Sequence, residues 1–211
     1  MPAASKAHSV AREAVNYVLD KGISGVPPLS SAANLAGEYL LDRSFGSNDA
    51  RVNSLIRWET SKNFTSGFLT GLGGLITLPI TIPAALGASW VVQARMAGAI
   101  AKIYGHNLED DRVRTFVLLS LAGDSAAAVV KDAGVQIGRK LTEKAIMAIP
   151  GRVLVEINKQ VGFRLITKAG ERGIVNLIKV VPVAGGVVGG SMDALSCRLV
   201  GRTAKMLFGR E

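Results

Sequence analysis

Few side chains in this sequence have the types and spacing that catalysis or metal binding requires. The two histidines, His8 and His106, lie far apart in the chain, whereas a zinc or catalytic histidine site needs its ligands in a group. The acidic residues 109–111 are consecutive, so their carboxylates would point in different directions on a helix. We interpret them as acids at the positive end of a helix, and we predict no metal site.

The common motifs for nucleotide binding and nucleophilic catalysis are also missing. The segment GLGG, which begins at Gly71, has Ile76 where a dinucleotide-binding fingerprint needs a third glycine. The sequence contains no phosphate-binding loop of the Walker type and no GxSxG nucleophile elbow. Cys197, the single cysteine, lies among apolar neighbours in an expected helix, which indicates a buried thiol. We therefore predict a non-enzymatic protein without a cofactor.

Two acids, Asp193 and Asp124, stand out because they lie in stretches of small and apolar residues. A carboxylate in such a place is costly unless it is paired. Arg198 is five positions from Asp193 and not on the same helix face, so Arg95 from another helix is the better candidate partner. We expect Arg95, Asp124 and Asp193 to be buried polar groups in structural ion pairs. The alternative is a lipid-acting enzyme in which Asp193 or Asp124 works with a basic residue that binds phosphate.

The helices that would carry these residues are expected to be apolar and poor in aromatic side chains. Hydrophobic residues make up 48% of the 211 residues and aromatic residues 5%, and the mean hydropathy is +0.31. Residues 63–94 contain no charged side chain and are interrupted by Pro79 and Pro83. We expect two helices hinged at these prolines, the second from about Pro83 to Ile103, in or beside a bilayer. The alternative is an apolar hairpin buried in the core of a soluble bundle.

Two sets of residues bear on this choice. Small residues at steps of four let helices pack closely, whether in a membrane, between subunits or inside a soluble bundle. The expected helix-packing residues are Gly67, Gly71, Gly74, Gly185, Gly186, Gly189, Gly190 and Gly201. The expected lipid-facing residues are Leu75, Leu78, Ile80, Ile82 and Leu86.

The charge balance favours an anionic partner. Twenty-five Lys and Arg against sixteen Asp and Glu give a net charge of +9, which attracts anionic lipid or nucleic acid. The low aromatic content and the lack of a base-reading module disfavour nucleic acid. The basic residues expected to face a membrane are Arg164, Lys168, Arg172, Arg198, Arg202 and Lys205. The alternative is that they belong to ordinary solvated helix faces.

Nearly every segment has helical periodicity, and no stretch alternates long enough to build a sheet. We predict an all-α fold: a compact multi-helix bundle with a central apolar helix pair broken at prolines and a glycine-rich C-terminal helix. Residues 1–62 would form N-terminal amphipathic helices, and residues 63–211 the helical core of one continuous domain. Ser9 is the expected cap of the first helix, and Gly170 and Gly173 are expected to separate two short helices.

Three segments of the sequence resemble the EcsC family of bacterial proteins. They are GFLTGLGGLITLPITIPAAL, QARMAGAIAKIYGHNLEDDRVRTFVLLSLAG and VVPVAGGVVGGSMDALSCRLVGRTAKMLF, and the resemblance extends over roughly residues 11–208. The family is named for a protein encoded beside an ABC exporter. The resemblance implies membrane association and supplies no catalytic residues to carry over.

The sequence therefore leads to two expectations about function. The first is a non-enzymatic, membrane-associated helical protein that assists or regulates a membrane complex or an envelope process. A single cysteine and the absence of a signal peptide place it in the cytoplasm, at the inner face of the membrane. The second is a soluble all-α binding module or homo-oligomer that buries its apolar hairpin.

Overall fold

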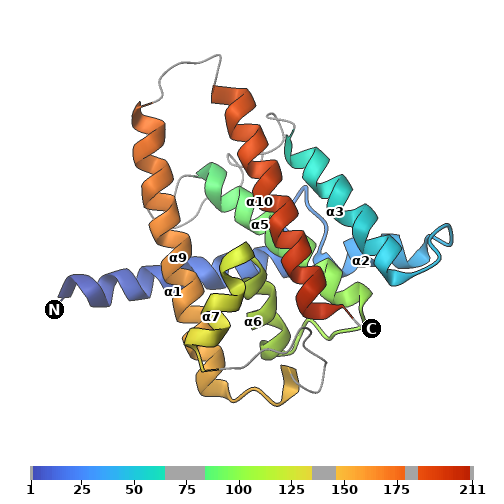
Figure 1. Cartoon of the computed structure of the whole chain (residues 1–211), viewed down its shortest axis with the longest axis horizontal. Helices are drawn as coiled ribbons and strands as arrows, with labels where there is room; N and C mark the ends of the chain where they lie inside the picture. The colour runs from blue at the N-terminus through green and yellow to red at the C-terminus, as the bar shows by residue number, and fades with distance from the viewer. Residues whose placement is uncertain (1, 65–83, 135–145, 179–184, 210–211) are drawn as a thin grey trace.

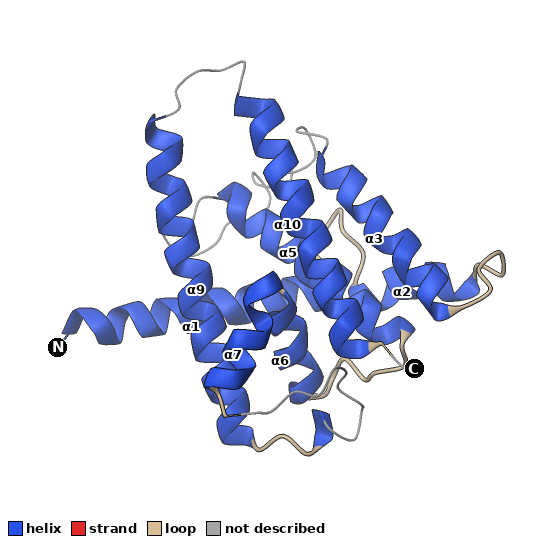
Figure 2. Ribbon diagram, viewed as in Figure 1, coloured by secondary structure: helices blue, strands red, loops and turns tan. Residues whose placement is uncertain are grey.

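The computed structural model describes the backbone of residues 2–64, 84–134, 146–178 and 185–209. Side chains are described for residues 12–62, 87–134, 146–165, 167 and 194–209. Within these ranges the regular structure is helical, and the one extended pairing is an isolated bridge between Val26 and Leu29 (Figure 2). The prediction of an all-α fold is confirmed.

The helices follow one another along the chain with short connections between most of them (Figure 1). Their bounds are α1 Pro2–Ser24, α2 Ala32–Leu41, α3 Asn48–Phe64, α5 Ala84–Ile103, α6 Asp111–Ser120, the 3-10 turn η1 Gly123–Ser125, α7 Ala126–Asp132, α9 Gly151–Ile178 and α10 Gly185–Phe208.

Helix α5 is the centre of the bundle. It packs against α1, α2, α3, α6 and α10, and the side chains of residues 87–101 are all buried. Its sequence is dominated by alanine, glycine and serine, and such small residues let several neighbouring helices approach one axis. The prediction of a helix from about Pro83 to Ile103 is confirmed to within a residue.

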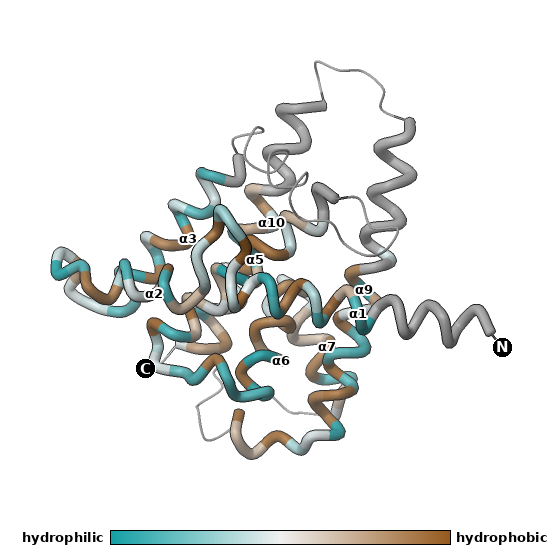
Figure 3. The backbone as a smooth tube through the Cα atoms, turned by 180° about the vertical axis from the view of Figure 1, so that it is seen from behind, coloured by the Kyte–Doolittle hydropathy of each residue, from teal (hydrophilic) through white to brown (hydrophobic). Residues whose placement is uncertain are grey.

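The surrounding helices form two layers around α5. In Figure 1, α9 and α10 lie on the near side, with α9 crossing α1 and α10 crossing α5. The first three helices, from the predicted N-terminal region, contact this core directly: α1 packs on α5 and α9, α2 on α5, and α3 on α10. Seen from behind, hydrophobic and hydrophilic positions alternate along α3 and α6, as expected for helices with one buried face (Figure 3).

Several helix ends differ from the sequence predictions. Ser31 caps α2, because its hydroxyl accepts a hydrogen bond from the backbone N–H of Asn34 at 3.1 Å. The cap predicted at Ser9 is wrong, since α1 begins at Pro2, a residue that the first turn of a helix tolerates. The break predicted at Gly170 and Gly173 is also wrong. Helix α9 continues through both glycines, because a single glycine weakens a helix by only about 1 kcal/mol.

Two helix crossings are close enough to require glycine. A Cβ atom on Gly22 of α1 would lie 2.6 Å from the Cβ of Ala94 and 3.1 Å from the backbone nitrogen of Arg95, both in α5. A Cβ on Gly201 of α10 would lie 2.8 Å from Cγ1 of Ile56 in α3. Gly201 belongs to the predicted helix-packing set, and Gly22 does not.

We predict opposite effects for the same substitution at two helical glycines. Gly22→Ala should lower the free energy of unfolding by about 1–3 kcal/mol, because the new methyl group meets α5 at a point where neither backbone nor alanine can move aside. Gly37→Ala should raise it by roughly 0.5–1 kcal/mol, because no atom lies within 4 Å of a Cβ there. Urea denaturation of both variants measures this, and equal effects would contradict the close crossing of α1 and α5.

Candidate functional site

The guanidinium of Arg95 is buried, and each of its three nitrogens has a partner. The residue is 6% exposed. Its Nε donates to the backbone carbonyl of Ser30 at 2.6 Å, and Nη2 donates to the Ser30 hydroxyl at 2.8 Å. Its Nη1 lies 3.7 Å from Oε1 of Glu59, which is 1% exposed and also 3.5 Å from Nζ of Lys62. This cluster ties α5 to α3 and to the connection between α1 and α2.

The acid that faces Arg95 is not the one the sequence suggested. We expected Asp193 as its counter-charge, whereas the carboxylate beside Arg95 belongs to Glu59. The side chain of Asp193 lies outside the described residues. A signal for Glu59 exists in the sequence, since it follows the buried residues Val52 and Ile56 by seven and three positions on the same face of α3.

The prediction that Asp124 is buried is wrong. We expected one helix to continue through this region, but α6 ends and the chain turns at Gly123, whose φ is +56°. Asp124 then lies in the 3-10 turn η1, and its side chain is exposed to solvent. A solvated carboxylate needs no buried partner.

Helix α10 presents a stripe in which two basic residues lie between two large apolar ones. Leu195 is 60% exposed and Met206 is 47% exposed, and Arg198 and Arg202 between them are exposed as well. At about 100° per residue these four positions fall within roughly 80° of one another around the helix axis. We call these four residues the α10 stripe.

Helix α9 carries a second stripe of the same composition. Val155 is 67% exposed and Phe163 is 54% exposed, and Arg152 and Lys159 are exposed on the same side of the helix. Glu156 lies at the margin, with Oε2 4.0 Å from Nζ of Lys159. We call Arg152, Val155, Lys159 and Phe163 the α9 stripe.

The remaining residues of the predicted basic face have other surroundings. Nζ of Lys205 lies 2.9 Å from Oδ2 of Asp49 and donates to Oδ1 of Asn53 at 3.0 Å, so it joins α10 to α3. The hydroxyl of Tyr104 donates to the other oxygen of Asp49 at 2.7 Å, and burial together with this hydrogen bond raises the pKa of Tyr104. Arg164 lines a small pocket. The side chains of Lys168 and Arg172 lie outside the described residues.

Most residues of the other predicted sets also fall outside the described part of the chain. Among the lipid-facing set, only Leu86 lies on a described helix, α5, and its side chain is not described. The residues of this set outside the described backbone are Leu75, Leu78, Ile80 and Ile82. Among the packing glycines, Gly67, Gly71 and Gly74 lie outside it, whereas Gly185, Gly186, Gly189 and Gly190 form the start of α10.

Two absences within the described residues bear on the kind of site. No group of three or more His, Cys, Asp or Glu side chains there could hold a metal ion. None of the helices in the described ranges combines the length and the hydrophobicity that a bilayer crossing requires.

The buried ion pair gives a sharp stability prediction. Arg95→Met should lower the free energy of unfolding by about 3–5 kcal/mol, because Glu59 then stays buried beside an apolar group. Lys62→Met, which removes the half-exposed partner of the same carboxylate, should cost roughly 0–1 kcal/mol. Replacing Arg95 and Glu59 together by methionine should recover part of the loss. A double variant that loses at least as much as the single one, measured in urea, would show that the pair is not the source of the effect.

The comparison with known protein families gives one result for nearly the whole chain. The model of the EcsC protein family matches residues 4–210. Neither the curated proteins nor the solved structures contain a match. With a match of this extent to the family model, the chain belongs to the EcsC protein family.

Proposed function

We propose that this protein is a non-enzymatic peripheral membrane protein that docks on anionic lipid through the α9 and α10 stripes. At the membrane it assists or regulates a membrane complex or an envelope process. The cytoplasmic face is the proposed side, because the single cysteine suits a reducing compartment and basic residues are enriched where proteins meet that leaflet.

The observation that carries the proposal is the composition of the two stripes. Four large apolar side chains, each about half exposed or more, share the two stripes with four exposed basic ones. Single exposed apolar residues are common on any protein, but a basic and apolar face at helical spacing is typical of helices that lie in a membrane interface.

The energetics of such a face suit reversible binding. Each Lys or Arg near an anionic surface contributes about 1 kcal/mol, and their long stems can extend along the lipid while the charged ends reach the phosphates. Burial of the exposed apolar side chains adds to this at about 25 cal/mol per Å². Both contributions are available without any change of the bundle, because these side chains already face solvent.

The uncharged run, residues 63–94, supports the proposal only through its composition. Residues 65–83 lie outside the described part, and residues 87–94 are buried inside the bundle. This burial favours the second candidate function, a soluble all-α binding module or homo-oligomer, for the same chain. In that case the two stripes would contact protein instead of lipid.

Vesicle binding of charge-reversal variants tests the proposal. Arg198→Glu/Arg202→Glu should reduce partition onto phosphatidylglycerol vesicles at least about tenfold, because two attractive charges become repulsive. Arg43→Glu/Arg57→Glu is the matched control, since it reverses two exposed arginines on other elements and gives the same net charge.

The apolar part of the stripe is tested in the same way. Leu195→Ser should weaken binding to these vesicles, whereas Leu41→Ser, at an 83% exposed leucine of α2, should leave it unchanged. Equal losses in the variant and control of either pair would indicate a nonspecific effect of net charge or hydrophobicity. A wild-type protein that stays in solution with all vesicles would contradict the proposal and favour the soluble binding module.

A further inference from the structure

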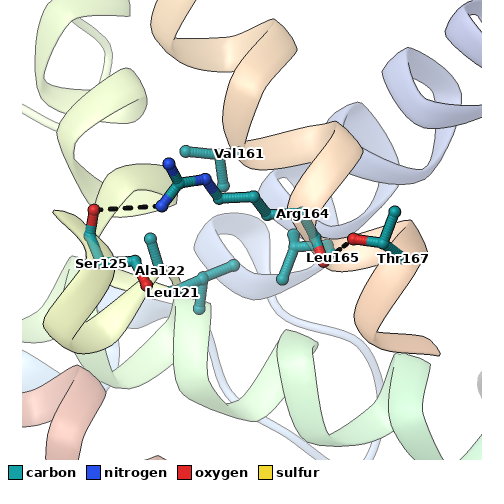
Figure 4. A pocket seen from close by; sticks show the side chains of 7 residues that line it. All are labelled: Leu121, Ala122, Ser125, Val161, Arg164, Leu165 and Thr167. Carbon is teal, nitrogen blue, oxygen red and sulfur yellow. Dashed lines mark hydrogen bonds between the residues drawn. The ribbon is translucent and has the colours of Figure 1, made fainter. Parts of the chain in front are cut away.

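A pocket of about 240 Å³ opens between the end of α6, the turn η1 and helix α9. Figure 4 shows the seven residues that line it. They are Leu121, Ala122, Ser125, Val161, Arg164, Leu165 and Thr167. None of them belongs to the α9 or α10 stripe, so the pocket is a feature separate from the proposed docking face.

The pocket has an apolar wall. Leu121, Val161 and Leu165 are each at most 5% exposed and belong to the hydrophobic core, and Ala122 lies beside them. These side chains come from two sides, with Leu121 and Ala122 at the end of α6 and the others on α9. A bound molecule would therefore need an apolar portion in contact with this wall.

The polar side of the pocket is dominated by Arg164. Its side chain reaches from α9 across to η1, where Nη1 donates to the backbone carbonyl of Ser125 at 3.4 Å (Figure 4). Its Nη2 lies 3.7 Å from Oδ2 of Asp132, whose side chain is 57% exposed. Both distances exceed the 2.7–2.9 Å that is usual when a charged nitrogen pairs closely with a carboxylate. The guanidinium is thus held loosely by partners that a stronger acceptor can replace.

The volume limits the size of the ligand. A cavity of roughly 150 Å³ holds a benzene ring, whereas pockets for drug-sized molecules have about 300–1,000 Å³. The observed volume lies between these, which suits a small molecule or one end of a larger molecule. The apolar wall selects a short hydrocarbon portion, and Arg164 selects a planar or tetrahedral anion that can accept two parallel hydrogen bonds.

From this arrangement we propose that the pocket binds the anionic end of an amphiphile, a carboxylate or a phosphate monoester, with the adjoining hydrocarbon on Leu121, Val161 and Leu165. Arg164 leaves Ser125 and pairs with the anion, and Asp132 turns to solvent. The inference goes beyond membrane docking, because it concerns a site for one molecule and holds whether that molecule is a free metabolite or part of a lipid.

Calorimetric titration of the full chain with octyl phosphate, below the concentration at which it forms micelles, tests the site. Inorganic phosphate and octanol should each bind at least about tenfold more weakly than octyl phosphate, because each lacks one half of the ligand. Arg164→Gln should weaken the binding of octyl phosphate at least about tenfold, as expected for the loss of a hydrogen bond to a charged group. Arg57→Gln is the matched control: it removes one exposed arginine from α3, outside the pocket and both stripes, and should change binding less than twofold.

A second variant tests the opposite wall, in case Arg164→Gln perturbs folding. Ala122→Phe fills the pocket from α6 and should abolish octyl phosphate binding, while circular dichroism confirms that the helices are intact. Octyl phosphate that binds Arg164→Gln or folded Ala122→Phe as tightly as the wild type would overturn the proposal.

Vesicles of phosphatidic acid then distinguish the two sources of the anion. If Arg164→Gln weakens vesicle binding together with octyl phosphate binding, the site holds a lipid head group. If it affects only octyl phosphate, the site holds a free amphiphile. Loss of vesicle binding in the α10 stripe variants with unchanged octyl phosphate affinity would show that docking and pocket are independent.

Discussion

The bundle depends on the burial of one charged helix made of small residues. Because half of the residues of α5 are alanine, glycine or serine, several helices can pack around it, and a Cβ on Gly22 of α1 would lie 2.6 Å from that of Ala94. That closeness leaves the guanidinium of Arg95 without water. Ser30 and Glu59 replace the water, and in doing so they fix the connection before α2 and the end of α3 against the central helix.

A core of this kind has consequences for the surface. Small residues fill the closest crossings, and the largest of the fully buried side chains are Phe116 and Phe208. Other large side chains, including Phe163 and Trp58, are left in solvent in a chain whose aromatic content is only 5%. On α9 and α10 exposed apolar residues lie on the same helix faces as arginine and lysine, which is the pattern that an anionic interface accommodates. The inside of the bundle and its proposed contact with lipid thus follow from the same composition.

Local signals made the helices predictable, whereas the pairing of side chains from different helices could not be predicted. Helical periodicity predicted helices within residues 1–62, where α1, α2 and most of α3 lie, and Pro83 marked the start of α5. The partner of Arg95 depends on which helix lies beside α5, and the sequence does not contain that information directly. The prediction that Asp124 is buried was wrong because the chain turns at Gly123 instead of continuing as a helix, and this turn exposes the Asp124 side chain. The pocket was missed since Leu121 and Arg164 are distant in sequence and meet only where α6 ends against α9.

The depth of individual side chains in a bilayer tests the central claim most directly. Nitroxide labels placed at Phe163, Leu195 and Leu41 can be compared by their collision rates with oxygen and with a water-soluble relaxing agent, in the presence of anionic vesicles. Cys197 is fully buried and leaves the introduced sites as the accessible thiols among the described residues. We expect labels at 163 and 195 to enter the lipid and the label at 41 to stay in water. Three labels that all remain in water on membrane-bound protein would contradict docking by α9 and α10.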